Sequence, residues 1–579
     1  MKVVIIGGVA GGMSTAARLR RLYEQAEIIV LERNRYVSFA NCGLPYHIGG
    51  DIKERDSLLV VTPEQLRANL NIEVRTGHMV TEIDREHKQV KVIDVHTSRP
   101  YAESYDKLVL AQGASAVRLP IPGVDHPRIF TLQNIGDMDA VKAVVDGGAQ
   151  SAVVIGGGYI GVEVAEALTH RGVQVHLVEL QNQVIPPLDC EMATDLQYHM
   201  EWHGVKLHLE TSVQAFKDDS GKVEVTLSNG EIFTTDLVVM GVGVRPISGL
   251  AQQAGLAQGV SGGLKVNEHL QTSDPDIYAV GDMVEVTNTV THQPAVIALA
   301  GPANRQGRIV ADHISGRLRS GYRSTQGTAI VKVFEMTGGG TGASEKNLKQ
   351  LNIPYRKVYL HPSGHAGYYP GTSPMHMKVL FSPDEGKILG AQIVGYDGVD
   401  KRLDVLATAI RAEMTVYDLE HLELAYAPPY GSAKDPINMA GFMAVNLLEG
   451  EVNFWYPDDY PTKTIQGALL DVRTQLEYDT WHIPGSIHIP LRELRARVGE
   501  LNGYAKQHLY IYCLSGFRSY LAYRIIYQAG LTDASTLAGG IKTFKSFHPT
   551  ELETGRPGMT LVAHAEDEMV KQPGMLAQA

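Results

Sequence analysis

The chain has 579 residues and a net charge of −12, and 44% of its residues are hydrophobic. This composition excludes a disordered or fibrous chain, and the acidic balance argues against nucleic acid or an anionic membrane as a partner. At about 150 residues per domain, the length predicts about four domains. The chain begins with a strand-like MKVVIIGG and has no apolar run of about 18 residues, so we expect a cytoplasmic protein.

The cysteines are few and lie far apart, at Cys42, Cys190 and Cys513. Their spacing fits neither a disulfide framework nor a zinc site, so we expect no metal. Cys190 lies in no motif and is interpreted as structural.

The N-terminal residues predict a dinucleotide-binding unit. Residues 3–33 form an apolar strand, a glycine turn, an amphipathic helix and a second apolar strand that ends at Glu32. Gly7, Gly8 and Gly12 lie in the turn, where backbone N–H groups at a helix start favour a pyrophosphate. Val9 replaces the middle glycine of the motif, so the alternative is a degenerate unit that only supports its neighbour.

A second, more regular unit follows about 149 residues later, at residues 153–180. Gly156, Gly158 and Gly161 fit G-x-G-x-x-G between a strand and a helix, and Glu179 ends the next strand. An acid at that place binds the ribose hydroxyls, and no Arg or Lys follows it at residues 180–183 to hold a 2′-phosphate. We therefore predict NADH rather than NADPH; a purely structural turn is the alternative.

Further motifs resemble the flavoprotein disulfide reductases that bind two dinucleotides. The segment TSDPDIYAVGDMVEV resembles their second flavin motif, which implies FAD with Asp282 at its ribityl chain. The segments around Gly113 and Gly243 resemble the connections between the FAD and NADH domains. By the same resemblance, Tyr159 would form an aromatic gate over the flavin and Glu163 would lie near the nicotinamide.

The segment SFANCGLPY contains Cys42 and no second cysteine. A single cysteine beside a flavin forms a mixed disulfide, a persulfide or a sulfenic acid, and a helix N-terminus would lower its pKa. The segment resembles the coenzyme A-disulfide reductases, which implies that Ser38, Asn41 and Cys42 line a thiol site. The alternative for Cys42 is a small buried hydrophobic residue.

The same resemblance implies a homodimer in which tyrosines of one subunit reach the other subunit's cysteine. Tyr430 in APPYGSAKDP is one candidate, and Tyr369, or its neighbour Tyr368, in HAGYYPG is another. Arg18, Arg21 and Arg305 could pair with the phosphates of coenzyme A, or could simply lie on solvated helix faces.

The last part of the chain has its own cysteine motif, CLSGFRS, between a predicted strand and a predicted helix. The six residues from Cys513 to Arg518 can direct successive N–H groups at the cysteine sulfur, which would hold a persulfide. With DVR and HIPGSIHIP upstream, the motif resembles a rhodanese sulfurtransferase domain. The alternatives are an inactive rhodanese scaffold and a phosphatase loop, which would be one residue longer.

The expected fold is α/β, with two Rossmann-like domains, an α+β dimerisation domain and a rhodanese domain. The expected boundaries are 1–112 with 244–322 for FAD, 113–243 for NADH, 323–447 for dimerisation, 448–464 as a linker, 465–555 for the rhodanese domain and 556–579 as a tail. The resemblance to coenzyme A-disulfide reductase–rhodanese fusions implies an NADH-dependent reductase of disulfides, persulfides or polysulfides. The alternatives are an NADH oxidase or peroxidase that cycles through a sulfenic acid, and a non-catalytic flavin redox sensor.

Overall fold

The computed structural model describes residues 1–317 and 321–548, so the expected tail and residues 549–555 lie outside the described residues. The chain divides into two units. The first unit contains Met1–Val184 and Met200–Gly327, and the second contains Ile185–His199 and the chain from Thr328 onward.

The first unit begins with a five-stranded parallel sheet whose central strand, β1 (Lys2–Ile6), is a buried apolar run. Buried strands of this kind are typical of parallel sheets that are covered on both faces. The strand order is β18 (Ile277–Ala279), β7 (Lys107–Leu110), β1, β2 (Glu27–Glu32) and β3 (Glu73–Thr76). The helices α1 (Ala10–Leu22) and α8 (Ala300–Ile314) pack against each other, and a methyl group on Gly307 would meet the Gly11 carbonyl oxygen at 2.5 Å.

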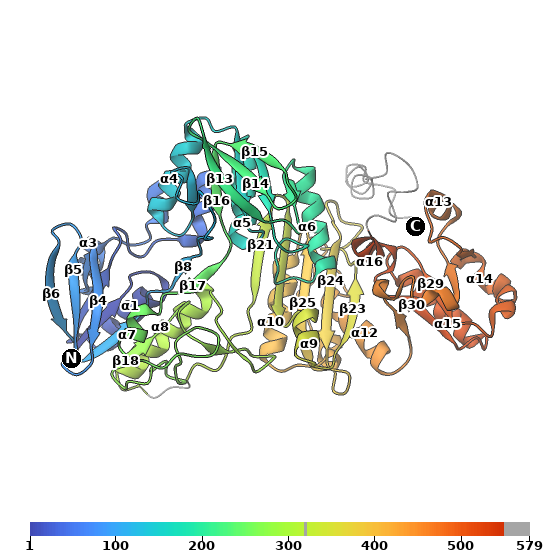
Figure 1. Cartoon of the computed structure of the whole chain (residues 1–579). Coiled ribbons are helices and arrows are strands. Elements are labelled where there is room, and N and C mark those ends of the chain that lie inside the picture. Colours follow the sequence, from blue (N-terminus) through green and yellow to red (C-terminus); the bar gives the residue numbers. More distant parts are fainter. Residues whose placement is uncertain (318–320, 549–579) are drawn as a thin grey trace. The chain divides into compact units, whose positions relative to one another are not determined.

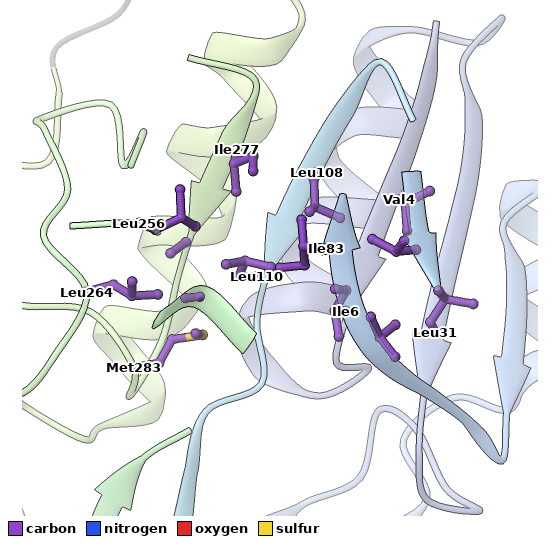
Figure 2. Packing of buried hydrophobic residues seen from close by; sticks show 14 of the residues in the cluster. Val4, Ile6, Leu31, Ile83, Leu108, Leu110, Leu256, Leu264, Ile277 and Met283 are labelled. Carbon is purple, nitrogen blue, oxygen red and sulfur yellow. The ribbon is translucent and has the colours of Figure 1, made fainter. Parts of the chain in front are cut away.

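The core of this part joins segments that are distant in the sequence. Figure 2 shows Val4, Ile6, Leu108 and Leu110 of the N-terminal strands in one cluster with Leu256, Leu264, Ile277 and Met283 from the later segment. This packing explains why the expected FAD domain consists of two pieces of the chain. The remaining elements here are η1 (Asn41–Gly43), α2 (Leu44–Gly49), η2 (Arg55–Leu58), α3 (Pro63–Leu70), β4 (His78–Asp84), β5 (Gln89–Asp94), β6 (Arg99–Ser104), α7 (Gly249–Gln253), β19 (Val286–Thr287) and β20 (Pro294–Ala295).

A second five-stranded parallel sheet is built on the second glycine motif. Its order is β12 (Lys206–His208), β11 (Gln174–Val178), β10 (Ser151–Ile155), β16 (Leu237–Met240) and β9 (Ile129–Thr131). The helices α4 (Ile135–Asp146) and α5 (Tyr159–His170) belong to it, and β13 (Val213–Asp219), β14 (Lys222–Leu227) and β15 (Ile232–Thr235) form an antiparallel sheet. The chain crosses between the two parallel sheets at the antiparallel pair β8 (Ala114–Ala116) and β17 (Val244–Pro246).

The second unit contains a five-stranded antiparallel sheet, ordered β21 (Ala329–Val333), β22 (Met336–Gly342), β25 (Ile388–Gly395), β24 (Met375–Phe381) and β23 (Arg356–Leu360). Its helices are α9 (Glu345–Gln350), α10 (Val399–Arg411), α11 (Val416–Glu420) and α12 (Pro436–Leu448). Figure 1 shows this sheet in yellow, with α10 beside it.

One segment differs from the expected boundaries. Residues 185–199, which we assigned to the NADH domain, belong to the second unit and contain most of α6 (Cys190–Trp202). The segment is held by buried polar contacts, because the Asp189 amide donates to the Gln392 side chain at 2.7 Å and Lys378 binds the Asp189 carboxylate at 2.9 Å. These partners are about two hundred residues away in the sequence, so local patterns did not reveal them.

The C-terminal part is a parallel sheet ordered β26 (Phe454–Trp455), β30 (Ala534–Leu537), β29 (Leu509–Tyr512), β27 (Ala468–Asp471) and β28 (Ile487–His488). Its helices are α13 (Gln475–Thr480), α14 (Leu491–Arg497), α15 (Phe517–Gln528) and α16 (Gly540–Phe547), shown in orange and red in Figure 1. The interpretation of residues 448–464 as a linker is corrected, because Trp455 lies buried in the edge strand and donates to the Ile511 carbonyl at 3.1 Å.

Within the described part of the chain, no helix has the length and apolar character that crossing a membrane requires. The predicted α/β class is confirmed, with two parallel sheets built on the glycine motifs, a five-stranded antiparallel sheet and a C-terminal parallel sheet.

Candidate functional site

The first glycine turn has the geometry of a nucleotide-binding turn. Gly7 has φ +104°, and a methyl group on Gly12 would overlap the Gly7 carbonyl oxygen. The Gly8 amide donates to the Glu32 carboxylate at 2.9 Å, which fixes the turn against the end of β2. Val9 lies just before α1 without disturbing that arrangement.

The second turn repeats this construction with its middle glycine present. Gly156 has φ +100°, and a methyl group on Gly161 would overlap the Gly156 carbonyl oxygen. The Gly157 amide donates to Glu179 at 2.6 Å. A methyl group on Gly158 would meet no atom within 4 Å, so this position is open to a ligand.

The remaining cofactor candidates lie at strand ends of the same unit. Gly113 (φ +67°) and Gly243 (φ +101°) lie at the β8/β17 crossing. Tyr159 begins α5, and burial raises its pKa to about 12. Asp282 follows β18, and burial raises the pKa of its carboxyl.

Cys42 lies in the short turn η1 that leads into α2. The segment is anchored at Ser38, whose amide donates to the Gly8 carbonyl at 2.8 Å. On its other side, α2 packs closely on α5. The two helices approach so closely at Gly49 that an added methyl group would lie 3.2 Å from Ala167. The cysteine loop is therefore held between the two predicted nucleotide sites.

The electrostatics of Cys42 differ from our expectation. We expected a helix N-terminus to lower its pKa, but burial among neighbouring atoms raises the pKa of the thiol, and the charges of Glu163 and Asp282 raise it further. The thiol is still exposed on its open side. The helical segments here are only three and six residues long, and two nearby carboxylates outweigh them.

Glu163 and Tyr46 form a pair beside this thiol. The Tyr46 hydroxyl donates to Glu163 at 3.2 Å. Burial raises the pKa of Glu163 to about 7, although the Tyr46 hydrogen bond opposes the shift. Sequence reasoning missed Tyr46, although it lies within the quoted NCGLPY segment.

The residues expected to contact coenzyme A are scattered over this unit. Arg18 is already ion-paired with Asp312 at 2.8 Å, whereas Arg21 and Arg305 are exposed. The Asn41 side chain donates to the Gln133 carbonyl at 3.4 Å. A role for these residues and for Ser38 in substrate binding stays a prediction.

The candidate tyrosines belong to the second unit. Tyr430 is 72% exposed and precedes α12, and Tyr369 is 42% exposed and lies between β23 and β24. Tyr368 instead shares a hydrogen bond with Tyr426 at 2.8 Å. A catalytic role for Tyr430 or Tyr369 stays a prediction.

The second cysteine motif closes a loop between β29 and α15. Cys513 is fully buried, the Gly516 amide donates to its sulfur at 3.2 Å, and Ser519 lies at 3.4 Å. We expected successive amides to point at the sulfur, but among the described residues Gly516 is the one whose N–H reaches it. The left-handed conformation of Gly516 (φ +100°) turns its N–H inward.

Arg518 closes the loop but is not free. Its guanidinium binds Glu477 of α13 through two hydrogen bonds, at 2.8 and 2.6 Å. Burial alone would raise the pKa of Glu477, but Arg518 and the Thr474 donors hold it at about 2. Sequence reasoning missed Glu477, although T-x-x-E before a helix is a recognisable capping box.

Comparisons with known proteins agree with this layout. Residues 1–307 match the pyridine nucleotide-disulphide oxidoreductases, residues 328–435 match their dimerisation domain, and residues 458–547 match the rhodanese-like domain. A coenzyme A disulfide reductase of Staphylococcus epidermidis is 37% identical over 76% of this chain and 99% of its own.

Two solved structures cover almost the whole chain. The reduced Bacillus anthracis CoADR-RHD has 48% identity and a TM-score of 0.92, over 95% of this chain and 98% of its own. An NAD-dependent persulfide reductase from A. fulgidus has 36% identity and a TM-score of 0.88, over 94% of this chain and 100% of its own.

The chain belongs to the pyridine nucleotide-disulphide oxidoreductases and is an oxidoreductase of that family. Within the family, it has the layout of a coenzyme A disulfide reductase fused to a rhodanese domain, as its motifs predicted.

The family uses FAD and NAD(H), and the two turns fit these groups. In each turn an added methyl group on the last glycine would overlap a backbone carbonyl oxygen, and each unit ends at an acid, Glu32 or Glu179, that accepts a backbone N–H.

Proposed function

We propose that the protein uses NADH to reduce the sulfur–sulfur bond of a disulfide, persulfide or polysulfide, with coenzyme A disulfide or persulfide as the main substrate class. The observation that carries this proposal is the placement of Cys42, the sole cysteine of the first unit, between the two nucleotide turns. Because its own unit has no second cysteine, we infer that Cys42 forms its disulfide with the substrate.

The Cys42 thiolate attacks one sulfur of a disulfide R–S–S–R′, forms a mixed disulfide with R and releases R′S⁻. With a persulfide R–S–SH, attack on the inner sulfur releases HS⁻ and leaves the same mixed disulfide. Bound FAD supplies the two-electron chemistry that connects NADH to this bond. Two electrons and one proton then return Cys42 to the thiolate and release RSH. Glu163, whose pKa is about 7, can hold a proton beside the sulfur at neutral pH.

The preference for NADH follows from the end of β11. Glu179 is followed by Leu180, which is 70% exposed, and by no cation up to residue 183. A Glu179→Ala/Leu180→Arg variant should therefore shift the ratio of kcat/KM for NADPH over NADH upward by at least about tenfold. A native preference for NADPH would contradict this assignment.

The proposed role of Cys513 is to accept sulfane sulfur as a persulfide within its loop. The Gly516 amide supports this role by donating to the sulfur. Because both cysteines belong to one chain, sulfur released at one is at high local concentration for the other.

Steady-state turnover with NADH tests the main proposal. We expect activity with coenzyme A disulfide, coenzyme A persulfide or polysulfide, and a loss of at least about a thousandfold in Cys42→Ser with flavin content unchanged. Efficient turnover of peroxide or oxygen alone would favour the NADH oxidase or peroxidase. Absence of turnover with every acceptor would favour the redox sensor.

A further inference from the structure

The mouth of the Cys513 loop carries a paired rather than a free cation. Arg518 is the last residue of the loop, and its guanidinium is close enough to Cys513 for the two charges to interact. Both of its hydrogen-bonding arms are bound to Glu477, which stays ionised because its pKa is about 2. The positive potential that would attract an anion to the sulfur is therefore neutralised.

A second arginine of the C-terminal sheet, Arg473, is also paired with a carboxylate. Arg473 follows β27 and binds the fully buried Asp471 at 2.7 Å. Arg473 cannot turn to a new anion without leaving the buried Asp471 carboxylate uncompensated, which is costly. Arg518 would have to give up both of its hydrogen bonds to the half-buried Glu477.

An exposed apolar residue precedes each member of the Arg518–Glu477 pair in the sequence. Leu476, next to Glu477, is 77% exposed, and Phe517, next to Arg518, is 63% exposed. Thiosulfate has no organic part that could contact such side chains, whereas an organic persulfide has one. Figure 1 shows the two helices that carry them, α13 and α15, in the same C-terminal part.

We propose that the Arg518–Glu477 pair makes Cys513 selective for organic persulfides and against the thiosulfate dianion. The inference deepens the proposed role of Cys513 and rests on it. The Cys513 thiolate attacks the outer sulfur of R–S–SH, the S–S bond breaks, and its electron pair leaves with RS⁻. The sulfur remains on Cys513 as a persulfide, and no external oxidant or reductant is consumed. Thiosulfate would have to release sulfite by the same step, but it meets the Glu477 charge, and the guanidinium of Arg518 is already bound to that carboxylate.

Two donors, glutathione persulfide and thiosulfate, test the proposal on the full-length holoenzyme. Peptide-resolved mass spectrometry measures addition of one sulfur atom to Cys513, and thiocyanate formation with cyanide gives kcat/KM. We expect wild-type protein to use the persulfide at least about tenfold better than thiosulfate.

The Glu477→Gln variant removes the negative charge that neutralises the Arg518 guanidinium. The ratio of kcat/KM for thiosulfate to kcat/KM for the persulfide should then rise by at least about tenfold. Glutamine preserves the capping box with Thr474, because an amide oxygen can accept the same bonds. The matched control is Glu500→Gln, which removes the same charge from the exposed Arg497–Glu500 pair and should leave the donor ratio unchanged. Adding Arg518→Met to Glu477→Gln should abolish the gain.

A second measurement needs no variant: sulfate, a dianion, should not slow persulfide loading of the wild-type protein. Equal use of both donors by wild-type protein, inhibition by sulfate, or no gain in a folded Glu477→Gln variant would overturn the inference. If no donor places sulfur on Cys513, the proposed role of Cys513 fails instead, and the two failures are distinguishable.

Discussion

Cys42, the nucleophile of the proposed reaction, lies beside a carboxyl group that affects the pKa of its thiol. Burial raises the pKa of the thiol first, and the negative charge of Glu163 raises it further. Since the pKa of Glu163 is about 7, that charge is absent in mild acid and present above neutrality. The coupling between these two residues therefore has a defined pH dependence.

The variant Glu163→Gln should lower the pKa of Cys42, because it removes the charge while its amide oxygen can still accept from Tyr46. Near pH 6, wild-type Glu163 is mostly protonated, so the Cys42 alkylation rates should agree. Near pH 8, the variant should react about threefold faster, the effect of a pKa lower by about half a unit. Peptide-resolved alkylation of the reduced holoenzyme measures this, with Cys190 as the internal control. A rate ratio that does not change with pH would contradict the coupling.

At the scale of elements, the second nucleotide turn combines a glycine that the fold requires with one that only a ligand requires. A methyl group at Gly161 would overlap the Gly156 carbonyl oxygen, whereas one at Gly158 meets no protein atom. The two positions therefore separate folding from binding.

We expect Gly161→Ala to destabilise the protein by about 1–3 kcal/mol, because the turn must move to admit the methyl group. Gly158→Ala should change stability by less than about 0.5 kcal/mol but raise the KM for NADH at least tenfold, since the pyrophosphate approaches the backbone there. Thermal denaturation and steady-state kinetics measure the two effects. A normal KM for NADH in Gly158→Ala would show that the nucleotide does not bind at this turn.

The turns were predictable because all their determinants lie within about 30 residues of sequence. The anchoring of residues 185–199 was not, since Asp189 meets Lys378 and Gln392 only through tertiary folding. The segment around Trp455 was misinterpreted for a related reason. Its prolines and acidic residues are typical of a linker, but the strand Phe454–Trp455 pairs with a strand formed by later residues, and the Trp455 indole donates to the Ile511 carbonyl. For the site, the motif around Cys42 was found, whereas its charge environment depends on the packing of α2 on α5.

A buried charge cluster attaches α6 to the antiparallel sheet. Lys378 is fully buried and binds Asp189 at 2.9 Å, Glu191 at 2.5 Å and Glu345 at 2.6 Å. Burial opposes ionisation of Asp189 and Glu345, but the Lys378 charge outweighs it and holds both pKa values below their usual range. The resulting stability is present above the usual carboxyl pKa and is lost only as the pH falls through the lowered values.

Lys378→Met should destabilise the attachment of residues 185–199 by about 3–5 kcal/mol, because it removes the cation that binds the buried carboxylates of Asp189 and Glu191. Glu345 keeps its ion pairs with Lys349 and Lys357. Hydrogen exchange of that segment, read by mass spectrometry at pH 7, measures the effect locally. The control is Lys387→Met, which breaks an exposed pair with Glu413 and should cost less than about 1 kcal/mol. Unchanged protection in Lys378→Met would show that packing alone holds the segment.

At the scale of the whole molecule, the dimerisation domain carries candidate site residues that could serve a second copy of the chain. The dimerisation domain of the second unit carries Tyr430 and Tyr369 with exposed side chains, and Cys42 belongs to the first unit. A phenol that donates a proton to a leaving thiolate is useful only if it reaches a cysteine. We propose that Tyr430 of one subunit serves the Cys42 of the other, which makes the homodimer the functional form.

Subunit mixing tests this arrangement. If Cys42→Ser and Tyr430→Phe chains are co-expressed in equal amounts, half of the dimers are mixed, and one site in each mixed dimer keeps both residues. About a quarter of the wild-type activity should then return, although each variant alone is inactive. The control replaces Tyr430→Phe with Tyr417→Phe, another exposed tyrosine of this unit, and should return about half, because half of all sites keep Cys42. Tandem affinity tags isolate the mixed dimers and measure their activity directly. Inactive mixed dimers would show that Tyr430 acts within its own subunit or outside the site.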